Sequence, residues 1–353
     1  MSRLISLRKK IDGIDKQLIV LLNKRASLAK GVGRLKSRAG KGVYVPDREA
    51  EIYKNIVEKN QGPLGAGALK AIYREIMSSS LALEKSLRIA YLGPEATFTN
   101  LAAIKKFGSQ VNYSPCSSIT EVFRDVEVGR SDYGVVPVEN STEGAVNHTL
   151  DMFIDSDLKI CSEVLLDISH NLVGNCRLKS VKRVYSNPQV FGQCRIWLDA
   201  NLRNVELIDV STTSRAAEIA RKEKSSCAIA SILAAEKYKL KVLARDIEDN
   251  THNITRFLVI GTHSPAPTKK DKTSIMFSGK DRSGALHDML APFKKNKVNL
   301  TNIESRPSKR KAWEYYFFVD MLGHCENPNV KKALKELSRH CSYLKVLGSY
   351  PLA

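Results

Sequence analysis

Apolar residues recur every three or four positions between Leu4 and about Ser37. They are Leu4, Leu7, Ile11, Ile14, Leu18, Leu21, Leu28, Val32 and Leu35. This spacing places them on one helical face with a near-heptad seam and predicts one long amphipathic helix. The segment 40–49 (GKGVYVPDRE) interrupts the pattern, and Pro46 suits the first turn of a second helix. After a break at 60–67 (NQGPLGAG), a third helix should carry Leu69, Ile72, Tyr73, Ile76, Met77 and Leu83.

The middle of the chain alternates between strand-like and helix-like patterns. The strand patterns are 87–93, 132–138, 181–186, 204–210, 226–231 and 255–261. The helical patterns between them are 101–108, 189–200, 214–223 and 232–240. This alternation is typical of an α/β domain, and we expect a mostly parallel sheet. Ligands of such sheets bind beyond the carboxyl ends of the strands. Those ends are polar here, at 93–95, 139–141, 186–188 and 211–213.

The last 80 or so residues predict a third domain. Strands are expected at 273–279, 298–307, 313–322 and 343–350, with helices at 284–296 and 329–340. This βαββαβ order is the ferredoxin-like arrangement, which we interpret as a ligand sensor or a pairing module. The pattern changes around Ser86, and 261–274 is a linker rich in proline, threonine and lysine. The expected domains are therefore 1–86, 87–263 and 272–353.

Composition limits the class of protein. The 353 residues are 43% hydrophobic and 26% charged, as in a soluble globular protein. No apolar run approaches the ~20 residues that a membrane helix needs, and the first ten residues lack the apolar core of a signal peptide. Seven cysteines, an odd number, include no Cys-x-x-Cys pair. We therefore expect reduced thiols, no structural zinc, no membrane partner and a cytoplasmic setting.

The net charge of +19 lies at the two ends of the chain. Residues 1–85 hold 18 Lys/Arg against 8 Asp/Glu, residues 273–353 hold 14 against 7, and the middle holds 24 against 22. A basic protein can bind nucleic acid. The cations, however, are interspersed with apolar residues, and no zinc-finger or RNA-binding motif is present. A small anionic ligand explains the sign as well, and we expect no nucleic-acid partner.

Three cations share the apolar face of the first predicted helix, namely Arg8, Arg25 and Lys36. Arg8 and Lys36 lie near the helix ends, where long side chains reach water. Arg25 lies on the seam itself, and a buried unpaired guanidinium costs several kcal/mol. An anionic ligand is therefore the better partner. Four further residues extend this polar set across the second and third helices, namely Arg48, Glu49, Ser80 and Glu84.

Helix geometry constrains how Arg8 and Arg25 can act together. They are 17 residues apart, which is about 25 Å along a helix at ~1.5 Å per residue. Two side chains that far apart can hardly hold one small molecule. If both bind the same ligand, Arg8 must come from a second subunit that runs antiparallel. The sequence therefore predicts an interlocked homodimer.

Several motifs in one order resemble a known family. The segments 7–36 (LRKKIDGIDKQLIVLLNKRASLAKGVGRLK) and 45–49 (VPDRE) are similar to the all-helical chorismate mutases. GPEATF, PVENSTEG, SNPQVFGQC and NITRF resemble prephenate dehydratase, and GAL and ESRP resemble the ACT regulatory domain. The order is that of the bifunctional chorismate mutase/prephenate dehydratases. The resemblance implies a multidomain fold with an all-α mutase domain, a two-lobed α/β dehydratase domain like the periplasmic binding proteins, and an α+β ferredoxin-like ACT domain.

The resemblance implies a mutase pocket that binds chorismate and rearranges it to prephenate. Its residues would be Arg8, Arg25, Lys36, Arg48, Glu49, Ser80 and Glu84. The rearrangement is pericyclic, so the pocket would hold a compact conformer and stabilise charge on the breaking ether. Arginines suit the two carboxylates, and Lys36 and Glu84 would act as catalytic donors to the ether. Because Glu84 can donate only when protonated, we expect mutase activity to fall as pH rises.

Thr255 and Arg256 stand where the strand 255–261 begins. Alone, they would be an ordinary polar strand edge. By resemblance, Thr255 donates a hydrogen bond to the departing hydroxyl of prephenate, and Arg256 binds a carboxylate. The implied prephenate site is Glu139, Asn140, Ser186, Gln193, Thr255, Arg256 and Phe257. Aromatisation drives this reaction, so the resemblance implies no cofactor and no metal. Ala96 departs from the glycine that relatives commonly have in GPEATF, and it should stiffen that loop.

The resemblance also implies feedback inhibition by an L-phenylalanine effector. Its site would consist of Gly284, Ala285, Leu286, Glu304, Ser305, Arg306 and Pro307. Spacing alone does not distinguish these residues from an ordinary helix start and strand end.

Two other classes of protein remain open from the residues. A transcriptional regulator would place the basic helices on DNA, although the first helix is far too long for a helix-turn-helix unit. A solute-binding protein would use the α/β domain as a two-lobed clamp. The missing signal peptide argues against that class.

Overall fold

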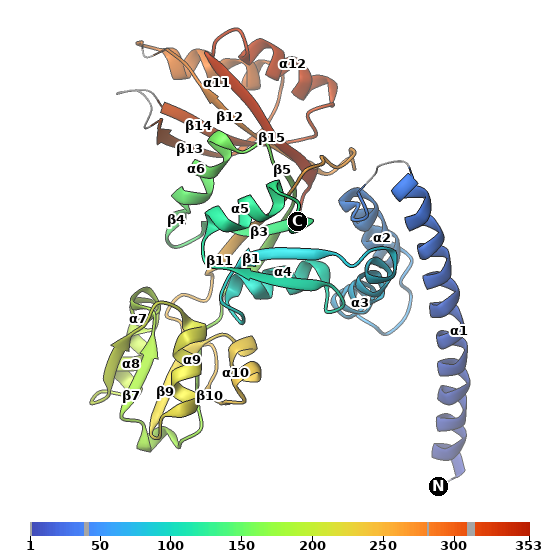
Figure 1. Cartoon of the computed structure of the whole chain (residues 1–353), viewed down its shortest axis with the longest axis vertical. Helices are drawn as coiled ribbons and strands as arrows, with labels where there is room; N and C mark the ends of the chain where they lie inside the picture. Colours follow the sequence, from blue (N-terminus) through green and yellow to red (C-terminus); the bar gives the residue numbers. More distant parts are fainter. Residues whose placement is uncertain (1, 39–41, 281, 309–314) are drawn as a thin grey trace. The chain divides into compact units, whose positions relative to one another are not determined.

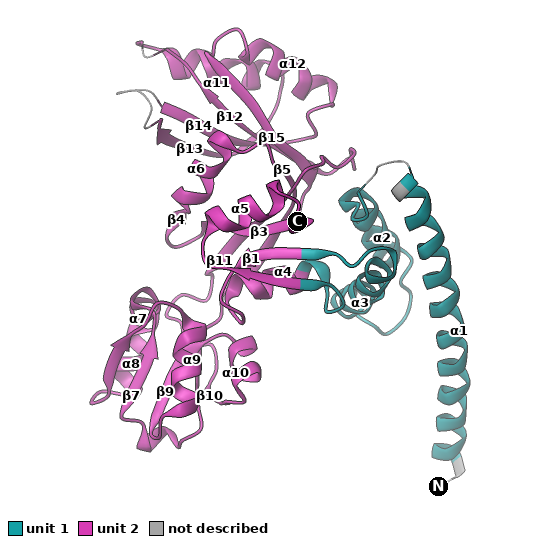
Figure 2. Ribbon diagram, viewed as in Figure 1, with its two compact units in different colours: residues 1–88, 106–112 teal, residues 89–105, 113–353 magenta. Residues whose placement is uncertain are grey.

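The computed structural model describes residues 2–38, 42–280, 282–308 and 315–353. The chain divides into two compact units (Figure 2). The first comprises 1–88 with 106–112, and the second comprises 89–105 with 113–353. Within the described part of the chain, no helix is both long enough and apolar enough to cross a membrane. Each of the seven cysteines is a free thiol.

The first unit contains the three expected helices (Figure 1). They are α1 (Ser2–Arg38), α2 (Pro46–Glu58) and α3 (Ala66–Glu84). Pro46 occupies the first turn of α2, as its fixed φ angle favours. Gly33 lets α1 approach α3 closely, because a Cβ there would lie 2.7 Å from Cγ of Glu84.

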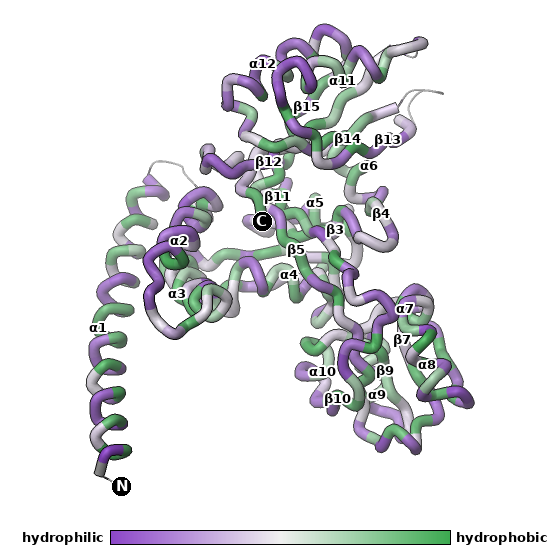
Figure 3. Tube along the Cα trace, turned by 180° about the vertical axis from the view of Figure 1, so that it is seen from behind, coloured by the Kyte–Doolittle hydropathy of each residue, from purple (hydrophilic) through white to green (hydrophobic). Residues whose placement is uncertain are grey.

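The apolar seam of α1 is largely exposed in the single chain. Leu18 is 48% exposed, Leu28 66% and Leu35 66%. Figure 3 shows apolar positions repeating along the whole length of this helix. The helix was expected to bury this seam, and one chain by itself does not do so.

The second unit begins with a six-stranded mixed sheet. Its order is β2-β1-β3-β11-β5, with β4 paired to β3. The strands are β1 (Arg88–Leu92), β2 (Asn112–Cys116), β3 (Tyr133–Asn140), β4 (Gly144–Ala145), β5 (Lys159–Asp167) and β11 (Ile254–Gly261). The helices that follow in this part of the chain are α4 (Phe98–Phe107), α5 (Ile119–Glu127) and α6 (Asn147–Asp155). α5 and α6 meet in the core, where Phe123 and Phe153 pack edge to face at 5.1 Å.

A second lobe, 171–244, carries its own five-stranded sheet of order β10-β6-β9-β7-β8. The strands are β6 (Asn171–Gly174), β7 (Arg183–Ser186), β8 (Glu206–Asp209), β9 (Ser226–Ala230) and β10 (Lys241–Ala244). The helices are η1 (Leu178–Ser180), α7 (Pro188–Gln193), α8 (Arg195–Asn201), α9 (Thr213–Lys222) and α10 (Ile232–Tyr238). The two-lobed α/β prediction is confirmed.

The expectation of a mostly parallel sheet was wrong. In the first sheet β11 runs antiparallel to both β3 and β5, and in the second β6 runs antiparallel to β9 and β10. The chain crosses between the lobes twice, after β5 and before β11, and the returning strand β11 enters the first sheet in the opposite direction. The periodicity of single segments carries no information on this pairing.

The C-terminal domain has the predicted βαββαβ order. Its sheet is β13-β14-β12-β15, and all three pairings are antiparallel. The strands are β12 (Asp271–Ser278), β13 (Leu300–Pro307), β14 (Tyr315–Leu322) and β15 (Tyr343–Pro351), and the helices are α11 (Ala285–Lys295) and α12 (Pro328–Leu337). Two residues of the predicted strand 313–322, namely 313 and 314, lie outside the described residues.

Gly348 in β15 allows a close backbone approach between this domain and the first lobe. A Cβ at Gly348 would lie 2.3 Å from the carbonyl oxygen of Ile160 in β5. Because that neighbour is backbone, Gly348→Ala should lower the free energy of unfolding by about 1–3 kcal/mol. Gly192→Ala is the control, since a Cβ there meets nothing within 4 Å. Guanidinium unfolding followed by circular dichroism would measure both, and equal midpoints would contradict the packing argument.

Candidate active sites

Two predicted mutase residues on α1 contact two on α3. Nη1 of Arg25 donates to Oγ of Ser80 at 2.7 Å, and Nζ of Lys36 lies 3.5 Å from Oε2 of Glu84. Ser80 and Glu84 are one turn apart, about 6 Å along the axis. The two cations therefore end on adjacent turns of α3. This separation suits a small molecule with two anionic groups.

Glu49 is buried, and its carboxylate is held from two sides. Oη of Tyr44 donates to it at 2.8 Å, and Nζ of Lys106 lies 2.8 Å away.

The remaining two residues of the predicted mutase site, Arg48 and Arg8, are placed differently. Arg48 is exposed and pairs with Glu51 at 2.5 Å. Arg8 lies on the exposed N-terminal half of α1, 17 residues from Arg25 in one continuous helix. A single chain thus brings together only part of the predicted mutase residues, and Arg8 does not lie with them.

Thr255 and Asn140 face each other across the β11–β3 pair. Their backbones are in register, and Nδ2 of Asn140 donates to Oγ1 of Thr255 at 2.7 Å. The same amide nitrogen donates to Oδ1 of Asn253 at 2.7 Å. Oδ1 of Asn140 accepts from the backbone N–H groups of Thr142 and Glu143 at 3.0 and 3.1 Å. With Oγ1 of Thr255 already accepting, its hydroxyl proton can be directed at a bound substrate.

Gln193 connects α7 to both the interlobe segment and the first lobe. Its Nε2 donates to Oε1 of Glu143 at 3.3 Å, so its Oε1 is the acceptor for Nε2 of His170 at 2.8 Å. His170 therefore carries its proton on Nε2. Burial lowers the pKa of His170, although Gln193 and Glu248 act in the other direction. A neutral His170 thus fixes the orientation of the Gln193 amide.

Ser186 and Phe257 are more deeply buried than a substrate-lining role requires. Ser186 is fully buried, and its hydroxyl donates to the carbonyl oxygen of Ile229 at 3.0 Å. Phe257 is 2% exposed in the middle of the sheet. Ser186 ends β7 in the sheet of the second lobe, and Phe257 lies within β11 in the sheet of the first lobe. Ala96 has a φ angle of 65°, in the left-handed region that favours glycine, which accounts for glycine as the commoner residue there.

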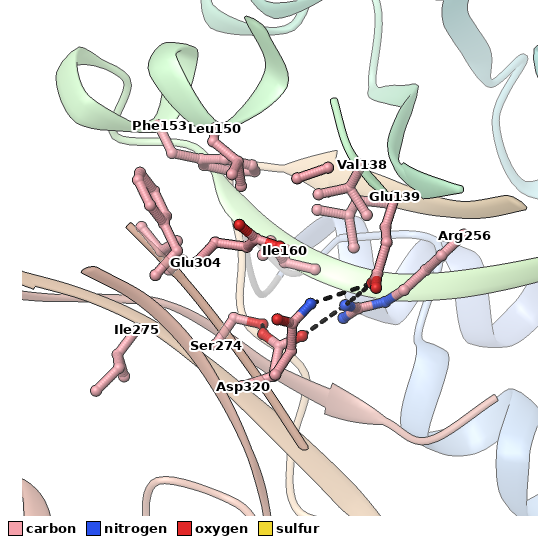
Figure 4. A pocket seen from close by; sticks show the side chains of 15 residues that line it. Val138, Glu139, Leu150, Phe153, Ile160, Arg256, Ser274, Ile275, Glu304 and Asp320 are labelled. Carbon is pink, nitrogen blue, oxygen red and sulfur yellow. Dashed lines mark hydrogen bonds and ion pairs between the residues drawn. The ribbon is translucent and has the colours of Figure 1, made fainter. Parts of the chain in front are cut away.

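Arg256 lies in a buried ion cluster on the other face of β11 (Figure 4). Its Nε donates to Glu163 at 2.8 Å, and its Nη1 donates to Asp320 at 2.5 Å. Nη2 donates to the hydroxyl of Tyr350 at 2.9 Å. Burial by itself would lower the pKa of Arg256, but the facing oxygens of Tyr350, Asp320 and Glu163 raise it above its usual value. The guanidinium is therefore a permanent charge.

Glu139 lies on the same face as Arg256. Its Oε2 is 3.7 Å from Nη1 of Arg256 and accepts from Nδ2 of Asn302 at 3.2 Å. The predicted prephenate residues are thus divided between the two faces of one strand pair. Thr255 and Asn140 lie on one face, and Arg256 and Glu139 on the other.

The predicted phenylalanine residues lie at the start of α11 and along β13. Gly284 has a φ angle of 77° and precedes the first residue of α11. Arg306 makes a bidentate pair with Asp151 of α6, with Nη2 3.1 Å from both carboxylate oxygens. Glu304 lines the small cavity that Glu139 and Arg256 also line. Leu286 is 38% exposed.

The sequence arguments missed several residues that hold these sites. They are Lys106, Glu143, Glu163, His170, Asn253, Asp320 and Tyr350. Glu143 and Asn253 stand within the motifs PVENSTEG and DNTHNITRF and could have been named. Asp320 and Tyr350 are ordinary members of alternating strand patterns. Only pairing between domains brings them to Arg256.

Three family models match the chain. They are chorismate mutase type II at 7–85, prephenate dehydratase at 89–265 and the ACT domain at 273–339. A bifunctional chorismate mutase/prephenate dehydratase of Aquifex aeolicus is 51% identical, with 100% of this chain and 99% of the relative covered.

Two solved structures each match about three quarters of the chain. The prephenate dehydratase of Arthrobacter aurescens in complex with L-Phe has a TM-score of 0.71 at 33% identity, covering 76% of this chain and 90% of its own. A chain described as a quorum-quenching acylase, GqqA, has a TM-score of 0.70 at 28% identity, covering 75% and 98%. One fold thus carries different chemistry, so similarity of fold alone does not assign the function. The family models and the full-length relative do assign it. The chain belongs to the bifunctional chorismate mutase/prephenate dehydratases, and its two activities are those of a chorismate mutase and a prephenate dehydratase.

Proposed function

We propose that Arg25, Lys36, Ser80 and Glu84 form the core of the mutase site. Chorismate has two carboxylates and a breakable ether, and its rearrangement needs no nucleophile or proton shuttle. The 3.5 Å contact of Lys36 with Glu84 and the contact of Arg25 with Ser80 support this assignment, because they place the two cations beside adjacent turns of α3. These groups select the compact conformer and stabilise negative charge on the ether oxygen. Arg48 and Glu49 at the start of α2 complete the pocket.

The mutase site is proposed to form in a homodimer, with Arg8 supplied by the partner subunit. The exposed seam of α1 supports this arrangement, since Leu18 and Leu28 are about half exposed or more in one chain. A second copy of the helix would cover that surface. An antiparallel partner would also bring its Arg8 to the Arg25 end of the site, which one straight helix does not allow.

The dehydratase site is proposed to centre on Thr255. Prephenate takes up one proton and loses carbon dioxide and water, and the ring becomes aromatic in phenylpyruvate. The observation that carries the proposal is the hydrogen bond from Asn140 to Oγ1 of Thr255, which leaves the hydroxyl proton for the departing oxygen. Glu139, Ser186, Gln193 and Phe257 belong to the proposed site by resemblance. Substrate binding by Arg256 stays a prediction from the resemblance. The guanidinium of Arg256 is already paired with Glu163 and Asp320.

L-Phenylalanine is proposed as a feedback inhibitor that binds at the C-terminal domain. The Arthrobacter aurescens relative was solved in complex with L-Phe. In this chain the proposed phenylalanine-binding residues are Gly284, Ala285, Leu286, Glu304, Ser305, Arg306 and Pro307.

The proposed domain boundaries remain 1–86, 87–263 and 272–353. A biosynthetic enzyme with seven free thiols fits a cytoplasmic setting.

Thr255→Val should stop the reaction sequence at prephenate. Loss of one positioned donor lowers the dehydratase kcat by about 10²–10³-fold. The mutase activity should persist, because its residues belong to the other unit. Chorismate loss and phenylpyruvate formation would be followed with the purified variant and with Thr262→Val, an exposed threonine just after the same strand. Full dehydratase activity in Thr255→Val would refute this role.

Glu84→Gln should change the pH profile of the mutase. A carboxylic acid can donate a hydrogen bond to the ether oxygen only when it carries its proton, whereas an amide donates at any pH. The ratio of variant to wild-type mutase activity should therefore increase with pH. Glu58→Gln, an exposed partner of Lys54, is the control. A constant activity ratio from pH 5 to pH 9 would mean that Glu84 does not donate to the ether.

Mixing two inactive variants tests the shared mutase site. If Arg8 of one subunit completes the site that holds Arg25 of the other, an Arg8→Ala/Arg25→Ala heterodimer has one intact site. Random reassociation of equal amounts should then restore about one quarter of the wild-type mutase activity. Co-expression or refolding of the mixture would provide the sample. No recovery in a mixture shown to contain heterodimers would place both arginines in the same subunit.

A further inference from the structure

Strand alternation separates the two residues that resemblance assigns to one site. Successive side chains of a strand point to opposite faces of the sheet. Thr255 accordingly contacts Asn140, while Arg256 is paired with Glu139, its register partner on β3. One strand pair thus presents a hydroxyl and an amide on one face, and a guanidinium and a carboxylate on the other.

The guanidinium of Arg256 joins the dehydratase sheet to the sheet of the ACT domain. Its Nη1 and Nη2 bind Asp320 of β14 and Tyr350 of β15, and its Nε binds Glu163 of β5. Glu163 in turn accepts from Lys272 of β12 at 2.8 Å. The start of β11 is therefore held to two ACT strands directly through Arg256, and to a third through Glu163 and Lys272.

The surroundings of Arg256 do not favour a substrate carboxylate. Three carboxylates already face it, those of Glu139, Glu163 and Asp320. The side chains that line the adjoining cavity are mostly apolar, among them Leu150, Phe153 and Phe318. A substrate carboxylate would have to displace a buried acid that is already paired.

We propose that Arg256 is a positioning residue, which holds the Thr255 hydroxyl in place and connects it to the ACT domain through Asp320 and Tyr350. A shift of the ACT sheet changes the anchoring of Arg256, and the backbone carries that change one residue along β11 to Thr255. The role rests on the proposed dehydratase site and on phenylalanine as effector. Coupling between two sites typically changes affinity about 5–150-fold and acts equally in both directions.

The test removes the charge of Asp320 and measures coupling rather than activity alone. The quantity is the inhibition ratio, defined as kcat/KM for prephenate without phenylalanine divided by kcat/KM with saturating phenylalanine. In Asp320→Asn the inhibition ratio should fall at least about threefold toward one, a sizeable part of a typical coupling. Calorimetry should still detect phenylalanine binding. A change in basal kcat/KM alone does not alter the inhibition ratio, because both of its terms are measured on the same variant.

Lys345→Met is the matched control. Lys345 is also a charged ACT residue that reaches the dehydratase part, since its Nζ donates to the carbonyl oxygens of Phe153 and Ser156 at 3.2 and 2.6 Å. These hydrogen bonds go to Phe153 and Ser156 rather than to Arg256, so loss of Lys345 should leave the inhibition ratio at the wild-type value. If Asp320→Asn does not fold, Tyr350→Phe takes its place, because it removes one neutral hydrogen bond from the same guanidinium. The inhibition ratio of Tyr350→Phe then tests the inference.

The outcomes separate this inference from the proposed function. A lower ratio in Asp320→Asn with an unchanged ratio in Lys345→Met supports it. An unchanged ratio in Asp320→Asn together with a lower KM would overturn it, because a guanidinium freed to bind substrate gives that result. An equal fall in both variants also overturns it, since coupling would then depend on the whole interface. Wild-type protein that turns over prephenate without responding to phenylalanine refutes this inference and the proposed feedback inhibition, but not the dehydratase site. Absence of turnover refutes the dehydratase site too.

Discussion

The alternation of side chains along β11 is the constraint on which the second unit depends. This strand lies between β3 and β5 in the first sheet, and it returns the chain from the second lobe. The side chains at the start of β11 therefore belong to two different networks of contacts, one on each face of the sheet. Thr255 belongs to the polar network of Asn140 and Asn253, and Arg256 belongs to the cluster with Glu163 and Asp320. A displacement of the strand start would affect both networks, because they share one backbone.

The ion cluster around Arg256 is better explained by specificity than by stability. Taking charges out of water costs several kcal/mol for each ion, and buried pairs often only balance that cost. The cluster nevertheless has a definite geometry, since Nε, Nη1 and Nη2 each have a different partner. Such a cluster fixes the register of two sheets against each other, which apolar packing alone specifies less sharply. Gly348 contributes to the same end by allowing β15 to approach β5.

The first unit illustrates a different constraint, which is the length of a single helix. α1 runs without interruption over 37 residues, so side chains at its two ends are separated by its full rise. Gly33 permits the close contact of α1 with Glu84, and Arg25 and Lys36 end beside α3. Arg8 lies on an apolar face that the same chain leaves exposed. The physical reason to invoke a second subunit is thus the same in the sequence and in the structure.

The sequence by itself determined the helices, most of the strands and the order of the three domains, and it supplied the candidate site residues. Periodicity and helix-start signals are local features of the sequence, so α1, the start of α2 at Pro46 and the βαββαβ order could all be predicted. Motifs such as PVENSTEG are likewise short and contiguous, so they can be recognised without a structure. Tertiary structure alone decided the strand directions in both lobes, the contact of Lys106 with Glu49, and the partners of Arg256. Those features depend on pairings between residues that are far apart in the sequence, such as Arg256 with Asp320. A one-dimensional pattern assigns a side chain to a face, but it does not say what lies opposite that face.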